Sequence, residues 1–123
     1  MQAKLTFLSK APAVVAPGAS LTLILTAKNE GKAAEVLRFR NGGRVDMQLI
    51  TSAGKVIFQW SKGMMFTMAL AAERLEPGVS KEWTVIAQLP ADLPTGQYTV
   101  RLWSMASGLE NSSSVNSAIR VMR

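Results

Sequence analysis

Residues 21–26 read Leu-Thr-Leu-Ile-Leu-Thr, and leucine stands at every second position. Successive side chains of a β-strand point to opposite faces, so this stretch predicts a strand with one leucine-lined face toward a core. The same period of two returns at residues 45–49, 56–60, 83–87, 98–102 and 115–121. Glycine-containing turn signals such as Pro17-Gly18 and Pro77-Gly78 separate these segments. The pattern predicts an all-β, antiparallel sandwich.

The composition fits one globular domain spanning residues 1–123. The chain has 48% hydrophobic and 18% charged residues, with no cysteine and no histidine. These absences exclude disulfide frameworks, thiolate metal sites and mechanisms that use an imidazole base. No apolar run approaches the length of a membrane span. A chain without cysteine suits a reducing cytosol, so we expect a cytoplasmic protein, although an exported protein with a removed signal fits the same composition.

The net charge of the chain raises the question of an acidic partner. Fourteen Lys and Arg against eight Asp and Glu give a formal charge of +6. The basic residues are scattered, and only Arg38, Arg40 and Arg44 form a local group. Because nucleic-acid binding needs a clustered basic surface, this scatter argues against it. The sequence leaves the oligomeric state open, since the edges of a sandwich permit dimerisation.

The carboxylates give no sign of an enzyme. Asp46, Glu73, Glu76 and Glu82 are separated by strand alternation and turns, so none forms a local catalytic pair. We therefore expect no catalytic residue, no cofactor and no metal site. Asp46 stands between two apolar residues, and we expect it to face solvent or to bond the turn at 41–43.

Tyr98 follows a Pro-Thr-Gly turn at 94–96 and begins an alternating segment. That spacing is typical of a tyrosine corner, in which the hydroxyl bonds nearby backbone across the sandwich. The alternative is an ordinary half-buried tyrosine in a strand.

Residues 58–70 carry an unusual density of large apolar side chains around Gly63. One interpretation places most of them in the core, with Trp60 filling the space between the sheets. The other leaves some of them exposed as a recognition surface, a role for which methionine is well suited. Residues 64–74 show weak helical spacing and no cap, so we predict irregular to strand structure there.

These residues also carry a resemblance to a known family. Residues 54–70 read Gly-Lys-Val-Ile-Phe-Gln-Trp-Ser-Lys-Gly-Met-Met-Phe-Thr-Met-Ala-Leu, and Leu-Glu-Pro-Gly follows at 75–78. This run resembles the BsuPI family of bacterial intracellular proteinase inhibitors, as do Phe39, the turn at 41–43 and Asp46 upstream. The resemblance covers roughly residues 3–89. The chain departs from the family pattern at three positions that bear on partner choice: Val45, where an aromatic is common, Phe58, often Trp, and Met68, often Gln.

The resemblance implies an immunoglobulin-like β-sandwich that inhibits a subtilisin-type serine proteinase inside a bacterial cell. It assigns structural positions of the family motif to Trp60, Phe66, Leu70, Asp46 and Tyr98. An inhibitor can present a rigid extended segment to a protease cleft, where one apolar side chain fills a pocket. The candidate contact residues are Lys62, Gly63, Met64 and Met65.

Two alternatives stay open beside this hypothesis. The inhibitory contacts may lie in the loop at 107–114, rich in serine and asparagine, for which we expect mobility. The chain may instead be a non-catalytic interaction or scaffold module, because sandwich folds host many unrelated binding roles.

Overall fold

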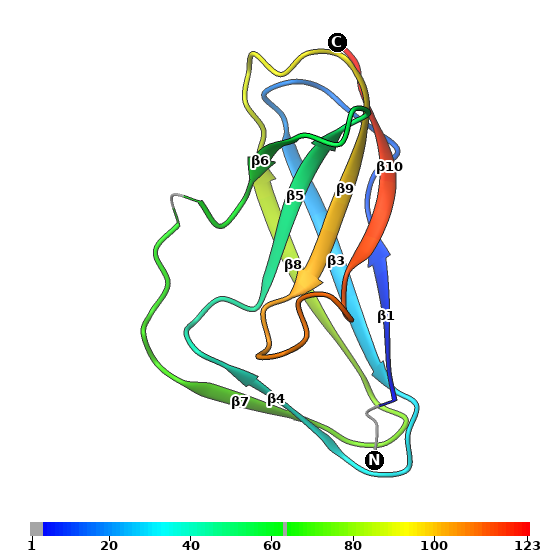
Figure 1. The fold of residues 1–123 in the computed structure, drawn as a ribbon, viewed down its shortest axis with the longest axis vertical. Helices are drawn as coiled ribbons and strands as arrows, with labels where there is room; N and C mark the ends of the chain where they lie inside the picture. The colour runs from blue at the N-terminus through cyan, green and yellow to red at the C-terminus, as the bar shows by residue number, and fades with distance from the viewer. Residues whose placement is uncertain (1–3, 63) are drawn as a thin grey trace.

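The computed structural model describes residues 4–62 and 64–123, and these form the elongated all-β fold of Figure 1. The described part of the chain contains no α-helix, and so no helical membrane span. Its strands are β1 (Leu5–Lys10), β2 (Val14–Val15), β3 (Ser20–Asn29), β4 (Glu35–Phe39), β5 (Val45–Thr51), β6 (Val56–Gln59), β7 (Ala71–Leu75), β8 (Ser80–Gln88), β9 (Gly96–Ser104) and β10 (Val115–Val121).

Two sheets face each other. One has the order β1-β3-β8, and the other has the order β2-β10-β9-β5-β6. Strands β4 and β7 form a separate antiparallel pair at one end of the molecule (Figure 1). Every pairing is antiparallel except the two-residue contact between β2 and β10, which is parallel. The antiparallel sandwich that the alternation predicts, and that the family resemblance describes as immunoglobulin-like, is confirmed with this one short exception.

The core lies between the two sheets and follows the period of two. Leu21, Leu23 and Leu25 of β3 are fully buried, and their threonine and isoleucine neighbours point to the outer face. Met47 and Leu49 of β5 meet them from the opposite sheet. Each leucine removed from water contributes about 1.5 to 3 kcal/mol to the free energy of unfolding, so these side chains fix which face of each strand is inside.

A second, smaller apolar cluster holds the β4–β7 pair. Leu37 and Phe39 of β4 are buried with Ala106, which follows β9. The buried Asn29 side chain also reaches this end of the molecule, because its Nδ2 donates to the carbonyls of Ala33 and Leu75 at 2.8 and 2.9 Å. These contacts fix β7, and with it one end of the segment that connects β6 to β7.

Tyr98 forms the tyrosine corner that its position predicts. Its ring is buried, and its hydroxyl donates to the carbonyl oxygen of Pro94 at 2.6 Å. The bond ties the start of β9 to the turn that precedes it.

The Tyr98→Phe variant should keep the fold and lose about 0.5 to 1.5 kcal/mol of unfolding free energy, because it removes one hydrogen bond and leaves the ring in place. Urea denaturation followed by tryptophan fluorescence measures the difference. An unchanged midpoint would mean that water replaces the bond at no cost.

Candidate functional site

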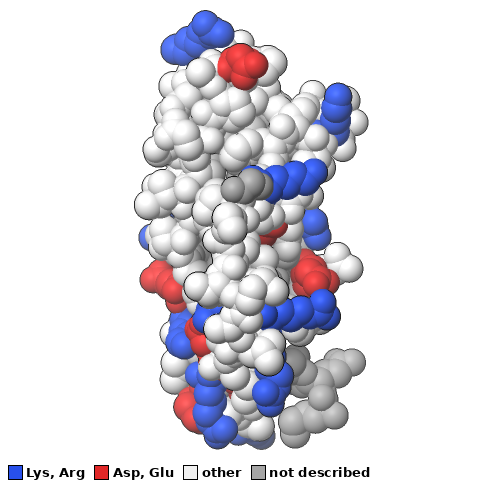
Figure 2. Space-filling view, turned by 90° about the vertical axis from the view of Figure 1, so that its left-hand side faces the viewer, with Lys and Arg blue, Asp and Glu red and all other residues white. Residues whose placement is uncertain are grey.

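The segment that connects β6 to β7 leaves the sandwich and swings out to one side (Figure 1). We call residues 60–62 and 64–70 the apolar loop. Met65 is 95% exposed, and Met68 and Leu70 are also largely exposed. On the face of the molecule shown in Figure 2, uncharged side chains form a continuous band down the centre, and most charged ones lie toward the lower end. An exposed apolar segment of this kind is typical of a recognition surface.

Asp46 holds the upstream end of this loop. The carboxylate is 3% exposed. Its Oδ1 accepts from the backbone amides of Met47 (2.8 Å) and Ser61 (3.1 Å), while its Oδ2 accepts from Gln59 Nε2 (2.7 Å) and Ser61 Oγ (2.5 Å). Four donors therefore converge on one carboxylate at the point where the loop begins.

We expected Asp46 either to face solvent or to bond the turn at 41–43, and both expectations are wrong. Strand alternation does place its side chain on the outer face of the sheet, since Val45 and Met47 fill the core. That position is not open to solvent, because the segment 59–61 folds over it and supplies three of its four donors. The carboxylate therefore bonds the start of the apolar loop and not the turn at 41–43.

The downstream part of the loop is held by a close backbone approach. The amide of Gly42 donates to the carbonyl of Thr67 at 2.8 Å. A Cβ at position 42 would collide with the Thr67 hydroxyl, so any larger residue there would force this side chain to move. Between the two anchors, the ring of Phe66 packs against Trp60 with centroids 5.8 Å apart. The loop is thus fixed at both ends and by an aromatic contact, while Met64 and Met65 project from it.

A cleft of about 390 Å³ lies under the loop at the open side of the sandwich. Trp60 and Phe66 line it from the loop, and Trp83 lines it from β8. Arg44 and Glu82 add one charge of each sign to its wall. The cleft joins the apolar loop to the edge of the three-stranded sheet.

Three charged side chains brace the strands around this cleft. Glu73 of β7 accepts from Arg44 Nε at 2.5 Å and from Lys81 Nζ at 2.9 Å. Burial raises the pKa of Glu73, but the hydrogen bonds and positive charges of Lys81 and Arg44 outweigh it and hold that pKa below its ordinary value. Arg44 also stacks on the ring of Phe39, 4.3 Å from the centroid. This group links β7 to β8 and to the start of β5.

The lowered pKa predicts a pH dependence with a definite sign. Ionised Glu73 stabilises the fold above its ordinary pKa, and this contribution is lost as the pH falls through the lowered, folded-state pKa. The Glu73→Gln variant should therefore be less stable than the parent near neutral pH, and the difference should shrink in acid. Urea titrations of both proteins between about pH 7 and about pH 3 measure it. A difference that stays constant with pH would contradict this role.

The predicted contact residues lie in the apolar loop as follows. Lys62, Met64 and Met65 are exposed, and Gly63 lies outside the described residues. The interpretation that most of this segment packs inside is wrong for both methionines, for Met68 and for Leu70. Trp60 and Phe66 are partly buried, and Trp60 packs against the main core at its open side. The irregular-to-strand prediction for 64–74 is confirmed, since an irregular stretch leads into β7.

The competing loop at 107–114 is tied into the fold. The buried hydroxyl of Ser113 accepts from the amide of Ser104 at 2.8 Å and donates to the carbonyl of Leu109 at 2.5 Å. Leu109 in turn packs against the cluster under β4. Sequence reasoning missed this anchor, because a single serine in a polar stretch gives no signal of burial.

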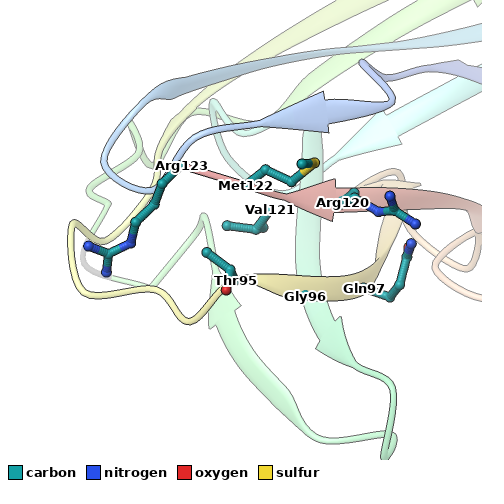
Figure 3. Close-up of a pocket in the computed structure, with 7 residues that line it drawn as sticks. All are labelled: Thr95, Gly96, Gln97, Arg120, Val121, Met122 and Arg123. Carbon is teal, nitrogen blue, oxygen red and sulfur yellow. The ribbon is translucent and has the colours of Figure 1, made fainter.

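A second hollow, of about 500 Å³, lies beside the start of β9 and the end of β10. It is lined by Gln97, Arg120 and Arg123 among others, and no Asp or Glu side chain belongs to its lining (Figure 3). With its amide oxygen turned to the guanidinium, Gln97 accepts from Nε and Nη2 of Arg120 at 2.8 and 2.7 Å. Within residues 4–62 and 64–123, acidic side chains form no cluster able to hold a metal ion.

Comparison with known protein families identifies the family of this chain. The sequence pattern of the BsuPI family, described as intracellular proteinase inhibitor, matches residues 8–109. The chain belongs to the BsuPI family. The match includes both anchors and the whole apolar loop of this BsuPI protein. No curated protein sequence matches the chain.

Solved structures share the fold of this BsuPI chain at low sequence identity. Spo0M, a sporulation control protein from Bacillus subtilis, has a TM-score of 0.60 at 14% identity over 99% of this chain and 49% of its own. A mutant β-glucosidase from Listeria innocua in complex with laminaribiose has the same TM-score and sequence identity, over 98% of this chain and 16% of its own. The CARDB domain of a Pyrococcus furiosus protein, in complex with di-metal ions, has a TM-score of 0.54 at 16% identity. The match covers 98% of this chain and 89% of that domain's chain.

These likenesses show the fold alone. The chain spans about half of the Spo0M chain and a small part of the β-glucosidase chain. The function of this chain therefore has to be argued from its family and its own loop.

Proposed function

We propose that this chain inhibits a subtilisin-type serine proteinase in the cytoplasm by binding it, without catalysing a reaction itself. The observation that carries the proposal is an exposed apolar loop with both ends anchored, from which Met64 and Met65 project. Membership of a proteinase inhibitor family supplies the class of partner.

The anchors suit a loop that a protease binds but cuts slowly. A loop that is already ordered loses little conformational entropy on binding, so more of its contact energy appears as affinity. After a cut, the Asp46 bonds to Ser61 and the Gly42 bond to Thr67 would still hold the two ends in place. Either slow cleavage or slow release of the cut loop then keeps the enzyme blocked.

The loop chemistry points to an enzyme with an apolar specificity pocket. Met64 and Met65 are flexible apolar side chains that fill such a pocket. Lys62 lies two residues upstream of Met64 and is the side chain that an acidic, trypsin-type pocket would select. Comparing a subtilisin-type with a trypsin-type enzyme therefore shows whether the loop binds through its methionines or through Lys62.

The test is a titration of a subtilisin-type proteinase with this protein, with a trypsin-type proteinase in parallel. Cleavage of a small peptide substrate reports the free active sites, and gel electrophoresis reports nicking of the inhibitor. We expect inhibition of the subtilisin-type enzyme that saturates near one-to-one while the protein stays intact. No inhibition by a folded, undegraded protein contradicts the proposal.

A second candidate is a non-catalytic interaction or scaffold module. It is favoured by one observation, since the same fold occurs as part of much longer chains. This alternative predicts no effect on either proteinase and binding through a sheet edge or loop face. The titration therefore decides between the two.

A further inference from the structure

The outer edge of β8 carries unpaired backbone groups. β8 pairs only with β3, so its other side is an edge of the three-stranded sheet. Leu89 donates to the carbonyl of Ala19, and Asn29 donates to that of Val79. Hydrogen-bonded pairs alternate along an antiparallel ladder. The bonds at residues 79 and 89 therefore mean that the amides and carbonyls of the odd-numbered residues of β8 point toward β3. The amides and carbonyls of Glu82, Thr84 and Ile86 therefore point outward.

This edge lacks the usual protection against pairing. β8 is nine residues long, runs in unbroken register with β3, and contains neither proline nor glycine. Glu82 is charged and exposed, the partly exposed Lys81 is paired with Glu73, and Thr84 and Ile86 are uncharged and exposed. Natural proteins usually blunt an edge of this length with a bulge, a proline or several charges. An unblunted edge is a template for adding another strand.

The edge is continuous with the apolar loop. Residues 82–85 of β8 line the same cleft as Trp60 and Phe66 of the loop. Trp60 and Phe66 flank Met64 and Met65 in the chain, so the cleft and β8 are neighbouring surfaces for a protein seated on these methionines. Stable complexes bury about 20 to 30 residues on each side, and the ten described residues of the apolar loop fall well short of that. A protease held by this loop needs a second contact, and the β8 edge, which lines the cleft beside the loop, can form backbone hydrogen bonds.

We propose that the proteinase adds an extended segment of its own to the β8 edge, beside Glu82, Thr84 and Ile86, and places an apolar side chain in the aromatic cleft. This inference rests on the proposed function, because it assigns a second contact to the same partner. The complex then has two contacts: the loop at the active site and a strand added to the β1-β3-β8 sheet.

Amide hydrogen exchange tests the added strand directly. In the free protein the amides of Glu82, Thr84 and Ile86 should exchange fast, while those of Trp83, Val85 and Ala87 are protected by β3. In complex with a subtilisin-type proteinase whose nucleophilic serine is replaced by alanine, the three outward amides should slow by about tenfold or more. A complex in which these amides remain fast overturns this inference and leaves the proposed function standing. Absence of any complex or inhibition overturns both.

One single variant and one matched pair of variants support the exchange experiment. Thr84→Pro removes one outward amide without breaking a bond to β3, and it should weaken binding about tenfold with the unfolding midpoint nearly unchanged. Ile86→Lys on β8 and Leu8→Lys on β1 change side chains that are 62% and 64% exposed on the same outer face. Only the β8 variant should weaken inhibition. Equal effects of the two lysines would overturn the assignment to this edge.

Discussion

The Asp46→Ala variant should lose about 2 to 4 kcal/mol of unfolding free energy and become a protease substrate where the parent is an inhibitor. The substitution removes the acceptor of four hydrogen bonds and strands the amides of Met47 and Ser61, which is costly at a buried site. The start of the apolar loop is then free to move, and binding has to supply the order that Asp46 provides. Urea denaturation measures the first effect, and the rate of loop cleavage on a gel measures the second.

Asp46→Asn is the matched control for this change. It keeps the size of the side chain and one acceptor oxygen, so it should retain the bonds to the amides of Met47 and Ser61 while weakening those to Gln59 and the Ser61 hydroxyl. We expect intermediate stability and slower cleavage than in the alanine variant. If Asp46→Ala destabilises the fold but inhibits as tightly as the parent, the carboxylate supports the sandwich and does not position the loop.

The strands of the sandwich were predictable because each carries its own signal. Leu21, Leu23 and Leu25 alternate with residues that tolerate water, and a one-residue slip would turn all three leucines outward. The tyrosine corner was predictable for the same reason, since the turn and Tyr98 are neighbours in the sequence. Local spacing therefore predicts a strand from its own residues, even where its partner lies far along the chain, as β8 does from β3.

The environment of Asp46 was not predictable, because its partners at 59–61 come from another strand. Alternation correctly assigns the residue to the outer face, but it says nothing about a later segment folding across that face. The bracing group of Arg44, Glu73 and Lys81 was missed for the same reason, since its members come from three parts of the chain. Charge pairs over such distances leave no pattern in one sequence.

The exposure of the apolar loop differs from what its composition predicts. Large apolar side chains usually indicate a core, and Phe66 and Trp60 do bury part of their surface. Met64, Met65 and Met68 stay exposed on a loop whose backbone is tied down by the carboxylate anchor and the Gly42 contact. Exposed apolar surface lowers the stability of an isolated chain. The exposure of the loop is best explained by a partner that covers it.

The double variant Met64→Asp/Met65→Asp should weaken inhibition by about a hundredfold or more without unfolding the protein. A methionine buried in a specificity pocket contributes about 2 kcal/mol, and an aspartate there adds the cost of taking an unpaired charge out of water. Both side chains are exposed in the free chain, so the unfolding free energy should change by less than about 0.5 kcal/mol. Titration of the subtilisin-type proteinase measures the affinity, and urea denaturation measures the fold.

Met122→Asp is the control, because Met122 is 47% exposed, close to the 45% of Met64, and lies outside the apolar loop, next to the end of β10 (Figure 3). It adds one negative charge where the loop variant adds two, so a general electrostatic effect on a chain of charge +6 would appear in it at about half the size. Inhibition lost in the loop variant and kept in the control assigns the contact to Met64 and Met65. Inhibition kept in a folded loop variant would move the contact away from these methionines, and the loop at 107–114 would then be the next segment to substitute.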